Sequence, residues 1–469
     1  MKHYDMIVIG SGSGMTLVDE GTHHGLKIAL VDRGPLGGTC LNVGCIPSKM
    51  LIFPADRIME IREAARLGIK AEIKSIDFSA IMRRMRKIIS ESQRHMREGL
   101  RNAENLDLYE GEGRFVADYT MEVGGKKIKG DKIIIASGSR PFIPPLKGID
   151  KVDYLTNETL LHLRKLPESL IIIGGGYIAV EYGHFFAAMG TKVTMLEMAD
   201  RLVLAEEPEI AELLRKKLAE RMEIVTGVQA GEVRPHRDGA SVTVKDRKTG
   251  APGEFRAERI LMAVGRRSNA DLLDVEKTGV KTDQRGFIQV NEHLETSKKG
   301  IYAIGDANGQ QMFTHEANQE AAIVTHNLLY DGKLVVDWST VPHAVYSHPQ
   351  IASVGLTEAA ARKDHEVLVG VAHYSDVAKG EAMMETEGFA KVIVDKKSEH
   401  ILGFHIIGPY APILIQEVVN AMVSGGHIDE INGGQHIHPA LSELVQLTVN
   451  SAEEPEGYRR NAGRHFPRE

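Results

Sequence analysis

The stretch Met6-Ile7-Val8-Ile9-Gly10-Ser11-Gly12-Ser13-Gly14 joins a short apolar run to a glycine-rich turn. The run predicts a buried parallel strand over Tyr4 to Ile9, followed by a helix and by a second strand, Lys27 to Val31, that ends in Asp32. Gly10, Gly12 and Gly14 let the backbone approach a pyrophosphate, and an acid at this spacing accepts hydrogen bonds from a ribose. The segment therefore predicts a dinucleotide-binding βαβ unit.

The same plan recurs after Leu170-Ile171-Ile172-Ile173, where Gly174-Gly175-Gly176 opens a helix expected to run to about Met189. A strand from Lys192 to Leu196 follows and ends in Glu197. One glycine fingerprint is weak evidence, but two copies with matching strands, helices and terminal acids are strong evidence. We therefore predict an α/β fold with two Rossmann-type dinucleotide-binding domains.

The acid of the second copy indicates which nicotinamide dinucleotide binds there. A carboxylate at Glu197 favours a free 2'-hydroxyl and repels a 2'-phosphate, which favours NAD over NADP. Arg201 is the nearby basic residue that weakens this interpretation. Two dinucleotides in one chain indicate that electrons pass from one cofactor to the other.

Bulk composition excludes several classes of function. The chain has 469 residues, too many for one ordinary core, and its net charge of -7 gives no general attraction to nucleic acid or anionic lipid. No run approaches the roughly 18 apolar residues that span a bilayer. We expect a cytoplasmic protein that binds neither nucleic acid nor membrane. A cluster of basic residues near the end is expected to be solvated: Arg459, Arg460, Arg464 and Arg468.

The chain contains two cysteines, Cys40 and Cys45, which lie in the segment GGTCLNVGCIPSK at residues 37–49. A disulfide that closes so short a loop removes little entropy from the unfolded chain, so reversible chemistry explains the pair better than stapling does. A disulfide needs Cα atoms within about 7 Å, which a regular helix does not offer at this spacing. Gly44 permits the required distortion, and a helix N-terminus lowers the pKa of a thiol. The segment predicts a redox-active pair.

This segment closely resembles the active-site segment of the class I pyridine nucleotide-disulfide oxidoreductases, which include dihydrolipoamide dehydrogenase, glutathione reductase, mycothione reductase and mercuric reductase. The resemblance implies FAD in the first domain and NAD in the second. It also implies that Cys45 faces the flavin and that Cys40 forms the mixed disulfide with the substrate. It extends along essentially the full chain, through residues 133–141, 260–267, 301–306, 346–355 and 437–443.

In the family's C-terminal His-Pro segment the histidine, here His438, is the acid/base, and the glutamate five residues later, here Glu443, orients it. Thiol chemistry near neutral pH needs such a proton carrier, although a lone histidine, such as the neighbouring His436, is more often structural. In this family the histidine acts as acid/base for the cysteine pair of the partner subunit, so the resemblance implies a homodimer.

The resemblance also implies the remaining cofactor contacts. Lys49 and Glu181 match positions that pair beside flavin and nicotinamide, and Asp306 matches the acid that binds the ribityl chain of FAD. No metal site is expected. Four further positions in the matching motifs are expected to contact the cofactors: Gly38, Thr39, Ser139 and Gly265.

These motifs predict an FAD-binding domain at 1–148, an NAD-binding domain at 149–267, a central domain at 268–340 that completes the FAD site, and an α+β dimerisation domain at 341–469.

Two features favour oxidation of dihydrolipoamide with NAD: Glu197, and the lack of the additional cysteine pair that mercuric reductases usually contain. The substrate would be a small molecule or a lipoyl domain. An alternative is an NAD(P)H-dependent reductase of a low-molecular-weight disulfide, of the mycothione or glutathione type. Met15, where a third small residue is usual, and Gln435 to Leu441 favour that alternative. A third hypothesis, a flavin-bearing scaffold without turnover, is disfavoured by the intact cysteine pair.

Overall fold

The computed structural model describes residues 1–453, so the four C-terminal arginines named above lie outside the described residues. Its first sheet has seven strands in the order β3-β2-β1-β6-β5-β4, with β16 paired to β6. The central pairs β1·β2, β1·β6 and β6·β16 are parallel, as the predicted βαβ unit requires. The strands are β1 (Lys2–Ile9), β2 (Ile28–Asp32), β3 (Leu106–Glu110), β4 (Gly113–Ala117), β5 (Thr120–Val123), β6 (Lys126–Ile135) and β16 (Ile301–Ala303).

Close packing at the end of β1 explains two of its glycines. Gly10 has φ +103°, and a Cβ there would lie 2.3 Å from the carbonyl oxygen of Ala136. A Cβ on Gly14 would lie 2.7 Å from the carbonyl oxygen of Gly10, so helix α1 (Met15–His23) approaches the strand at a position where no side chain fits. Met15 follows this contact and packs against a buried cluster that includes Val8 and Leu17.

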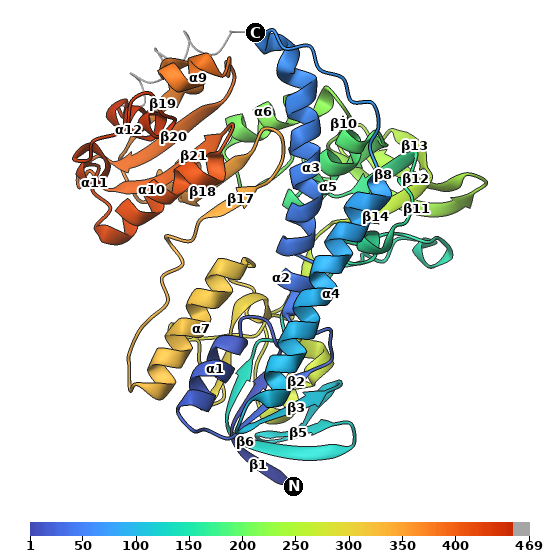
Figure 1. Ribbon diagram of the computed structural model, residues 1–469, viewed down its shortest axis with the longest axis vertical. Helices are drawn as coiled ribbons and strands as arrows, with labels where there is room; N and C mark the ends of the chain where they lie inside the picture. The colour runs from blue at the N-terminus through green and yellow to red at the C-terminus, as the bar shows by residue number, and fades with distance from the viewer. Residues whose placement is uncertain (454–469) are drawn as a thin grey trace.

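Two long helices, α3 (Cys45–Glu63) and α4 (Phe78–Asn102), run from the first sheet toward the other units (Figure 1). The expected amphipathic helix from Phe78 to Leu100 corresponds to α4, which buries Met82, Met85 and Ile89. The side chain of Asp77 caps α4 by accepting a hydrogen bond from the amide of Ala80 at 2.8 Å.

The second nucleotide unit, predicted at residues 149–267, repeats the parallel βαβ arrangement of the first. Its parallel sheet has the order β10-β9-β8-β14, and an antiparallel sheet of β11, β12 and β13 lies beside it. Gly174 has φ +120°, and a Cβ there would lie 2.2 Å from the carbonyl oxygen of Ala263, which repeats the geometry of Gly10. The elements are β8 (Ser169–Ile173), α5 (Tyr177–Met189), β9 (Lys192–Leu196), α6 (Pro208–Ala219), β10 (Glu223–Val225), β11 (Val228–His236), β12 (Gly239–Asp246), β13 (Pro252–Ala257) and β14 (Arg259–Met262).

Residues 268–340 share the core of the first unit. Strand β16 joins the first sheet beside β6, and Ala270, Val275 and Ile288 are buried in one cluster with residues of β1. Helix α7 (Thr314–Leu329) lies along α1 (Figure 1). The two chain crossings between the units pair as short antiparallel strands, β7 (Ser139–Pro141) and β15 (Arg266–Ser268).

The C-terminal unit is an antiparallel sheet of order β17-β18-β21-β20-β19 packed with α10 and α12, which confirms the predicted α+β class. No helix among residues 1–453 combines the length and apolar character needed to cross a membrane. The elements are β17 (His343–Val345), β18 (Ile351–Gly355), α8 (Glu358–Ala361), β19 (Val367–His373), α9 (Ala378–Ala382), β20 (Phe389–Asp395), β21 (Ile401–Ile407), α10 (Ala411–Ser424), α11 (Asp429–Asn432) and α12 (Ser442–Asn450).

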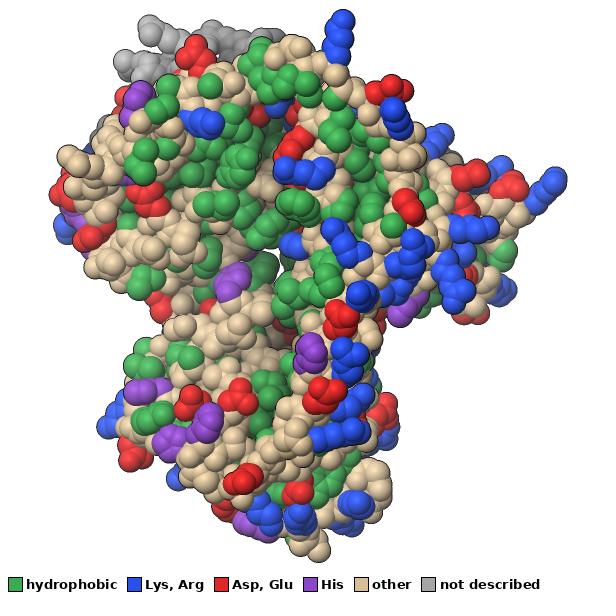
Figure 2. All heavy atoms as spheres, viewed as in Figure 1, with side chains coloured by type: hydrophobic (Ala, Val, Ile, Leu, Met, Phe, Trp, Pro, Cys, Tyr) green, Lys and Arg blue, Asp and Glu red, His purple; other side chains and the backbone are tan. Residues whose placement is uncertain are grey.

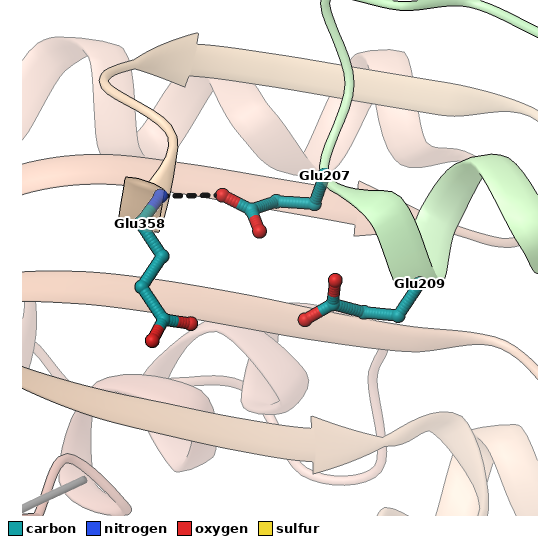
Figure 3. Close-up of side chains that lie close together, drawn as sticks. All are labelled: Glu207, Glu209 and Glu358. Atoms are coloured by element: carbon teal, nitrogen blue, oxygen red, sulfur yellow. Dashed lines mark hydrogen bonds between the residues drawn. The ribbon is translucent and has the colours of Figure 1, made fainter. Parts of the chain in front are cut away.

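A buried ionic network joins the second nucleotide unit to the C-terminal unit. Glu207 and Glu209 at the start of α6 point toward Glu358 of α8 (Figure 3). The ammonium of Lys391, whose side chain is 1% exposed, lies 2.8 Å, 2.6 Å and 2.7 Å from these three carboxylates. The carboxylates therefore surround a protein cation, and together they hold β20 against α6.

Candidate active site

A cavity of about 1660 Å³ extends from the first glycine turn to the cysteine pair. Its volume exceeds that of an ordinary ligand pocket and is sufficient for an extended dinucleotide. Eleven of the predicted site residues line it: Gly10, Gly12, Asp32, Gly38, Thr39, Cys40, Cys45, Lys49, Ser139, Glu181 and Asp306. The lining does not include seven others: Gly14, Gly174, Gly176, Glu197, Gly265, His438 and Glu443.

At the glycine-turn end of the cavity, the backbone leaves no room for side chains. A Cβ on Gly38, which has φ +63°, would lie 2.7 Å from the Cα of Gly12, so the cysteine segment rests directly on the turn. Asp32 accepts hydrogen bonds from the Ser11 amide at 2.7 Å and from the Gly34 amide at 2.6 Å. The glycine cradle, the start of α1 and this acid fit the pyrophosphate and ribose of a dinucleotide.

Asp306 also lines the cavity and is held by two residues from the chain crossings. The Ser139 hydroxyl donates to Asp306 Oδ2 at 2.5 Å, and Arg266 Nε donates to Ser139 Oγ at 2.6 Å. Arg266 Nε also lies 3.5 Å from Asp306 Oδ2. The motif at residues 260–267 contains Arg266 but predicts no role for it, because the pairing of β7 with β15 is what brings Arg266 to Asp306.

The two cysteines lie at a break between helices. Helix α2 (Gly38–Asn42) ends before Gly44, and α3 begins at Cys45. A Cβ on Gly44 would lie 2.9 Å from the carbonyl oxygen of Thr39, which explains why glycine occupies the break. Both cysteines are free thiols, and they are close enough for each to perturb the other. The distortion predicted from their spacing is therefore present.

The site favours a thiolate at Cys45. The pKa of Cys45 is lowered to about 6, mainly by a hydrogen bond from Cys40 and also by Thr314 and the charge of Lys49, whereas burial opposes the shift. The same contact with Cys45, together with burial, raises the pKa of Cys40. Thr314 Oγ1 lies 3.2 Å from Cys45 Sγ. Thr314 is a site residue that the sequence analysis missed, because the start of α7 is 269 positions from Cys45 and no local pattern links them.

Lys49 and Glu181 form the predicted pair, on the lining of the cavity that also contains Cys45. Lys49 Nζ donates to both carboxylate oxygens of Glu181, at 2.8 Å and 3.0 Å. The amide of Tyr346 donates to Glu181 at 3.0 Å, and the centroid of the Tyr346 ring lies 4.3 Å from Lys49 Nζ. Burial raises the pKa of Glu181, and the charge of Lys49 opposes that rise. The pair therefore joins α3, α5 and the segment after β17 at one wall of the cavity.

The second glycine turn lies beyond the lining of this cavity. Glu197 directly follows β9 and accepts a hydrogen bond from the Ala199 amide at 2.6 Å, and its side chain would lie 2.8 Å from a Cβ on Gly175. Gly176 has open space around its Cα, and Gly265 has φ +131° at the crossing into β15. The turn and the acid thus form the predicted arrangement for a second dinucleotide.

His438 and Glu443 form a pair in the C-terminal unit. His438 Nδ1 lies 2.8 Å from Glu443 Oε1, and the histidine side chain is 71% exposed. The Ala440 amide and His438 both lower the pKa of Glu443 by hydrogen bonding. His436 instead pairs with Glu417 at 2.6 Å and is 7% exposed, which fits a structural role. The exposed histidine has its second nitrogen available for chemistry, but it does not line the cavity of its own chain.

Comparison with known proteins identifies the family. The family model described as pyridine nucleotide-disulphide oxidoreductase matches residues 4–321. The model of that family's dimerisation domain matches residues 341–449. The chain belongs to the pyridine nucleotide-disulphide oxidoreductases. The fold class predicted from the sequence is that of this oxidoreductase family.

Relatives in the pyridine nucleotide-disulphide oxidoreductase family span several activities. The chain is 37% identical to a mycothione reductase from Mycobacterium tuberculosis strain H37Rv, over 95% of this chain and 98% of the relative. It is 35% identical to a dihydrolipoyl dehydrogenase from Thermus scotoductus, over 94% and 96%, and 33% identical to a mercuric reductase from Staphylococcus aureus, over 95% and 82%. The HOCl-induced flavoprotein disulfide reductase RclA from Escherichia coli is 28% identical, with a TM-score of 0.84 over 95% of this chain and 99% of that one.

Membership of this family supports FAD as the cofactor and a homodimer as the assembly. The chain is an FAD-dependent disulfide oxidoreductase, and its dimerisation domain supports a homodimer. Figure 2 shows hydrophobic side chains gathered on the C-terminal unit beside the central hollow, and exposed hydrophobic residues of that unit include Ile413, Val423 and Ile437. Exposed apolar surface of this kind marks an interaction site.

Proposed function

We propose that the chain oxidises a dithiol with NAD, that dihydrolipoamide is its preferred substrate, and that Cys40 and Cys45 carry the reaction. The observation behind the proposal is the thiol pair that shares one cavity with the glycine turn, the Lys49–Glu181 ion pair and Asp306. The low pKa of Cys45, about 6, makes its thiolate the electron donor of the pair. Reversible thiol chemistry suits a reducing, cytoplasmic compartment.

The proposed thiol exchange balances without an outside oxidant. One substrate thiol attacks Sγ of Cys40 in the Cys40–Cys45 disulfide, and Cys45 leaves as a thiolate. The second substrate thiol attacks the substrate sulfur of the mixed disulfide, releases Cys40 and closes the substrate disulfide. The partner subunit's His438, held by Glu443, accepts the protons of the attacking thiols. FAD held in this cavity would supply two-electron transfer between the reduced cysteines and NAD, and of the two protons from the substrate thiols one would leave in the hydride and one would be released to solvent.

The residues assigned to each cofactor follow from the two turns. We propose that FAD lies between domain 1–148 and the central residues 268–340, against Gly10, Gly12, Gly14, Asp32, Gly38, Thr39, Lys49, Ser139 and Asp306. We propose that NAD binds domain 149–267 through Gly174, Gly176, Glu181, Glu197 and Gly265, and that domain 341–469 supplies His438 to the partner. The charge of Glu197 at the ribose position is the reason for NAD rather than NADP.

A second candidate function is reduction of a low-molecular-weight disulfide by NAD(P)H. It is favoured by the 37% identity to mycothione reductase along nearly the full length of both chains. The same residues would act, with electrons moving from nicotinamide to the cysteines and with His438 returning protons to the leaving thiols. The two candidates therefore differ in the outer substrate and in the direction of electron flow.

Steady-state rates test the proposal directly. Dihydrolipoamide with NAD is compared with NADH and NADPH paired with lipoamide, glutathione disulfide and mycothione disulfide. The proposal expects the highest kcat/KM for dihydrolipoamide with NAD and complete loss of turnover in Cys40→Ser and Cys45→Ser. A mycothione or glutathione disulfide rate that exceeds the dihydrolipoamide rate would overturn the substrate assignment. Full turnover in either serine variant would overturn the chemistry.

An anaerobic titration separates an enzyme from an inert scaffold. Addition of NADH to the purified flavoprotein is expected to produce long-wavelength absorbance, because the thiolate of Cys45 would donate charge to a flavin held in the same cavity. Flavin reduction without that absorbance would mean that the cysteines take no part in the reaction.

A further inference from the structure

An aromatic wall lines the cavity next to Cys45. The ring of Phe313 stacks with His315 at 5.5 Å and with His343 at 5.8 Å between centroids, each at an interplanar angle of 7°. Phe313 also contacts the ring of Tyr177 at 6.0 Å. All four side chains line the cavity, and Phe313 immediately precedes Thr314, the residue that contacts Cys45.

A buried carboxylate from another unit holds His343 in this wall. His343 Nε2 lies 2.7 Å from Glu206 Oε1, and the side chain of Glu206 is 2% exposed. The Ser353 hydroxyl donates to the other oxygen of Glu206 at 2.6 Å. Glu206 precedes Glu207, so neighbouring residues of one loop contact Lys391 and His343. His343 therefore connects the second nucleotide unit, β17 and the ring of Phe313.

The position of Tyr177 indicates that this aromatic wall lies toward the second dinucleotide turn. Tyr177 is the first residue of α5 and follows directly after Gly174-Gly175-Gly176, the turn of the second dinucleotide site. Tyr177 lines the cavity together with Lys49 and Cys45, so a nicotinamide bound at this turn would approach the cysteines alongside Tyr177. The rings of Tyr177 and Phe313 are in contact, so the orientation of Phe313 affects that path.

We propose that His343 and Glu206 are a positioning pair that orients Phe313 against Tyr177 and thereby sets how tightly the nicotinamide ring engages the cavity. This inference deepens the proposed function and rests on it. Glu206 fixes the imidazole of His343, the imidazole stacks with Phe313, and neither residue of the pair takes part in the thiol exchange. Neither residue was singled out by a sequence motif, because the two lie 137 positions apart.

Separate half-reactions test the proposal on the full-length flavoprotein. In His343→Ala, the NADH concentration for half-maximal flavin reduction is expected to rise between about twofold and about tenfold, the effect of losing one aromatic stacking contact. The maximal rate and the rate of flavin reduction by dithiothreitol are expected to stay within about twofold of wild type. Phe313→Leu, which leaves the bond between His343 and Glu206 in place, is expected to give a similar rise.

A double-mutant cycle shows whether the pair acts through Phe313. If it does, adding His343→Ala to Phe313→Leu raises the half-maximal concentration little further, whereas independent effects would multiply. His365→Ala is the matched control, because His365 pairs with Asp395 at 2.7 Å in the C-terminal unit and does not line the cavity.

Two results separate the failure of this inference from the failure of the proposed function. An unchanged NADH dependence in both His343→Ala and Phe313→Leu, with normal wild-type reduction, overturns the inference alone. An equal slowing of the NADH and dithiothreitol reactions in these variants also overturns it, because the role is then structural. A wild-type flavin that neither NADH nor NADPH reduces overturns the proposed function itself.

Discussion

Replacing Thr314 with valine removes the hydroxyl that lies 3.2 Å from Cys45 Sγ and keeps the size of the side chain. The pKa of Cys45 is about 6, so about nine-tenths of the reduced enzyme carries a thiolate at pH 7. A hydrogen bond to a charged group contributes about 1.5 to 3 kcal/mol, and a change of about 1.4 kcal/mol is tenfold in the ionisation equilibrium. The thiolate fraction of Thr314→Val at pH 7 is therefore expected to fall to about one half or less.

The sign of the pH dependence follows from the direction of the pKa. The Cys45 thiolate is present above its pKa and is lost as the pH falls through it, so removal of a stabilising donor moves the midpoint upward. The assay is the long-wavelength absorbance of enzyme reduced anaerobically by a dithiol, recorded between about pH 5 and about pH 9. Thr314→Ser keeps the hydroxyl and is expected to titrate like wild type.

Coincident titration curves for wild type and Thr314→Val would refute this account, because they would mean that the hydroxyl does not stabilise the thiolate. A midpoint that moves upward equally in Thr314→Ser would also refute it, since the cause would then be packing rather than the hydrogen bond.

Three further predictions concern cofactor choice, proton transfer and stability. Glu197→Gln removes the charge that repels a 2'-phosphate, so the ratio of kcat/KM for NADPH over NADH should rise at least about tenfold; an unchanged ratio contradicts the assignment. His438→Gln should lower kcat between about a hundredfold and about ten thousandfold with flavin retained, and full activity would exclude the histidine as the acid/base. Lys391→Met leaves three carboxylates around an uncharged side chain and should lower the free energy of unfolding in urea by about 3 to 5 kcal/mol, whereas the exposed Lys397→Met should not change it.

Much of the architecture could be predicted because its causes are local. The strand Lys192 to Leu196 and the end of a helix at Met189 are observed as expected, since an apolar run and a glycine turn constrain the backbone without help from distant residues. His438 and Glu443 pair within one segment, and the break before Cys45 follows from the spacing of two sulfurs. The pairing of β16 with β6 in the first sheet, by contrast, joins segments far apart in the chain, and no local pattern predicts it.

Polar contacts between distant segments could not be predicted in the same way. Thr314 reaches Cys45, Arg266 reaches Asp306, and Lys391 enters a ring of carboxylates only after several sheets have packed together. A threonine, arginine or lysine suits many environments, so its residue type and its local spacing do not identify its partner.

The amino-acid sequence alone therefore determined the two βαβ units, the cysteine segment and the family, since hydrophobic periodicity and glycine backbone requirements act over a few neighbouring residues. Only the tertiary structure decided which side chains surround the thiolate and which unit supports each wall of the cavity. Those contacts depend on strand order and on the packing of helices far apart in the chain, where the stabilising energy comes from close approach in space.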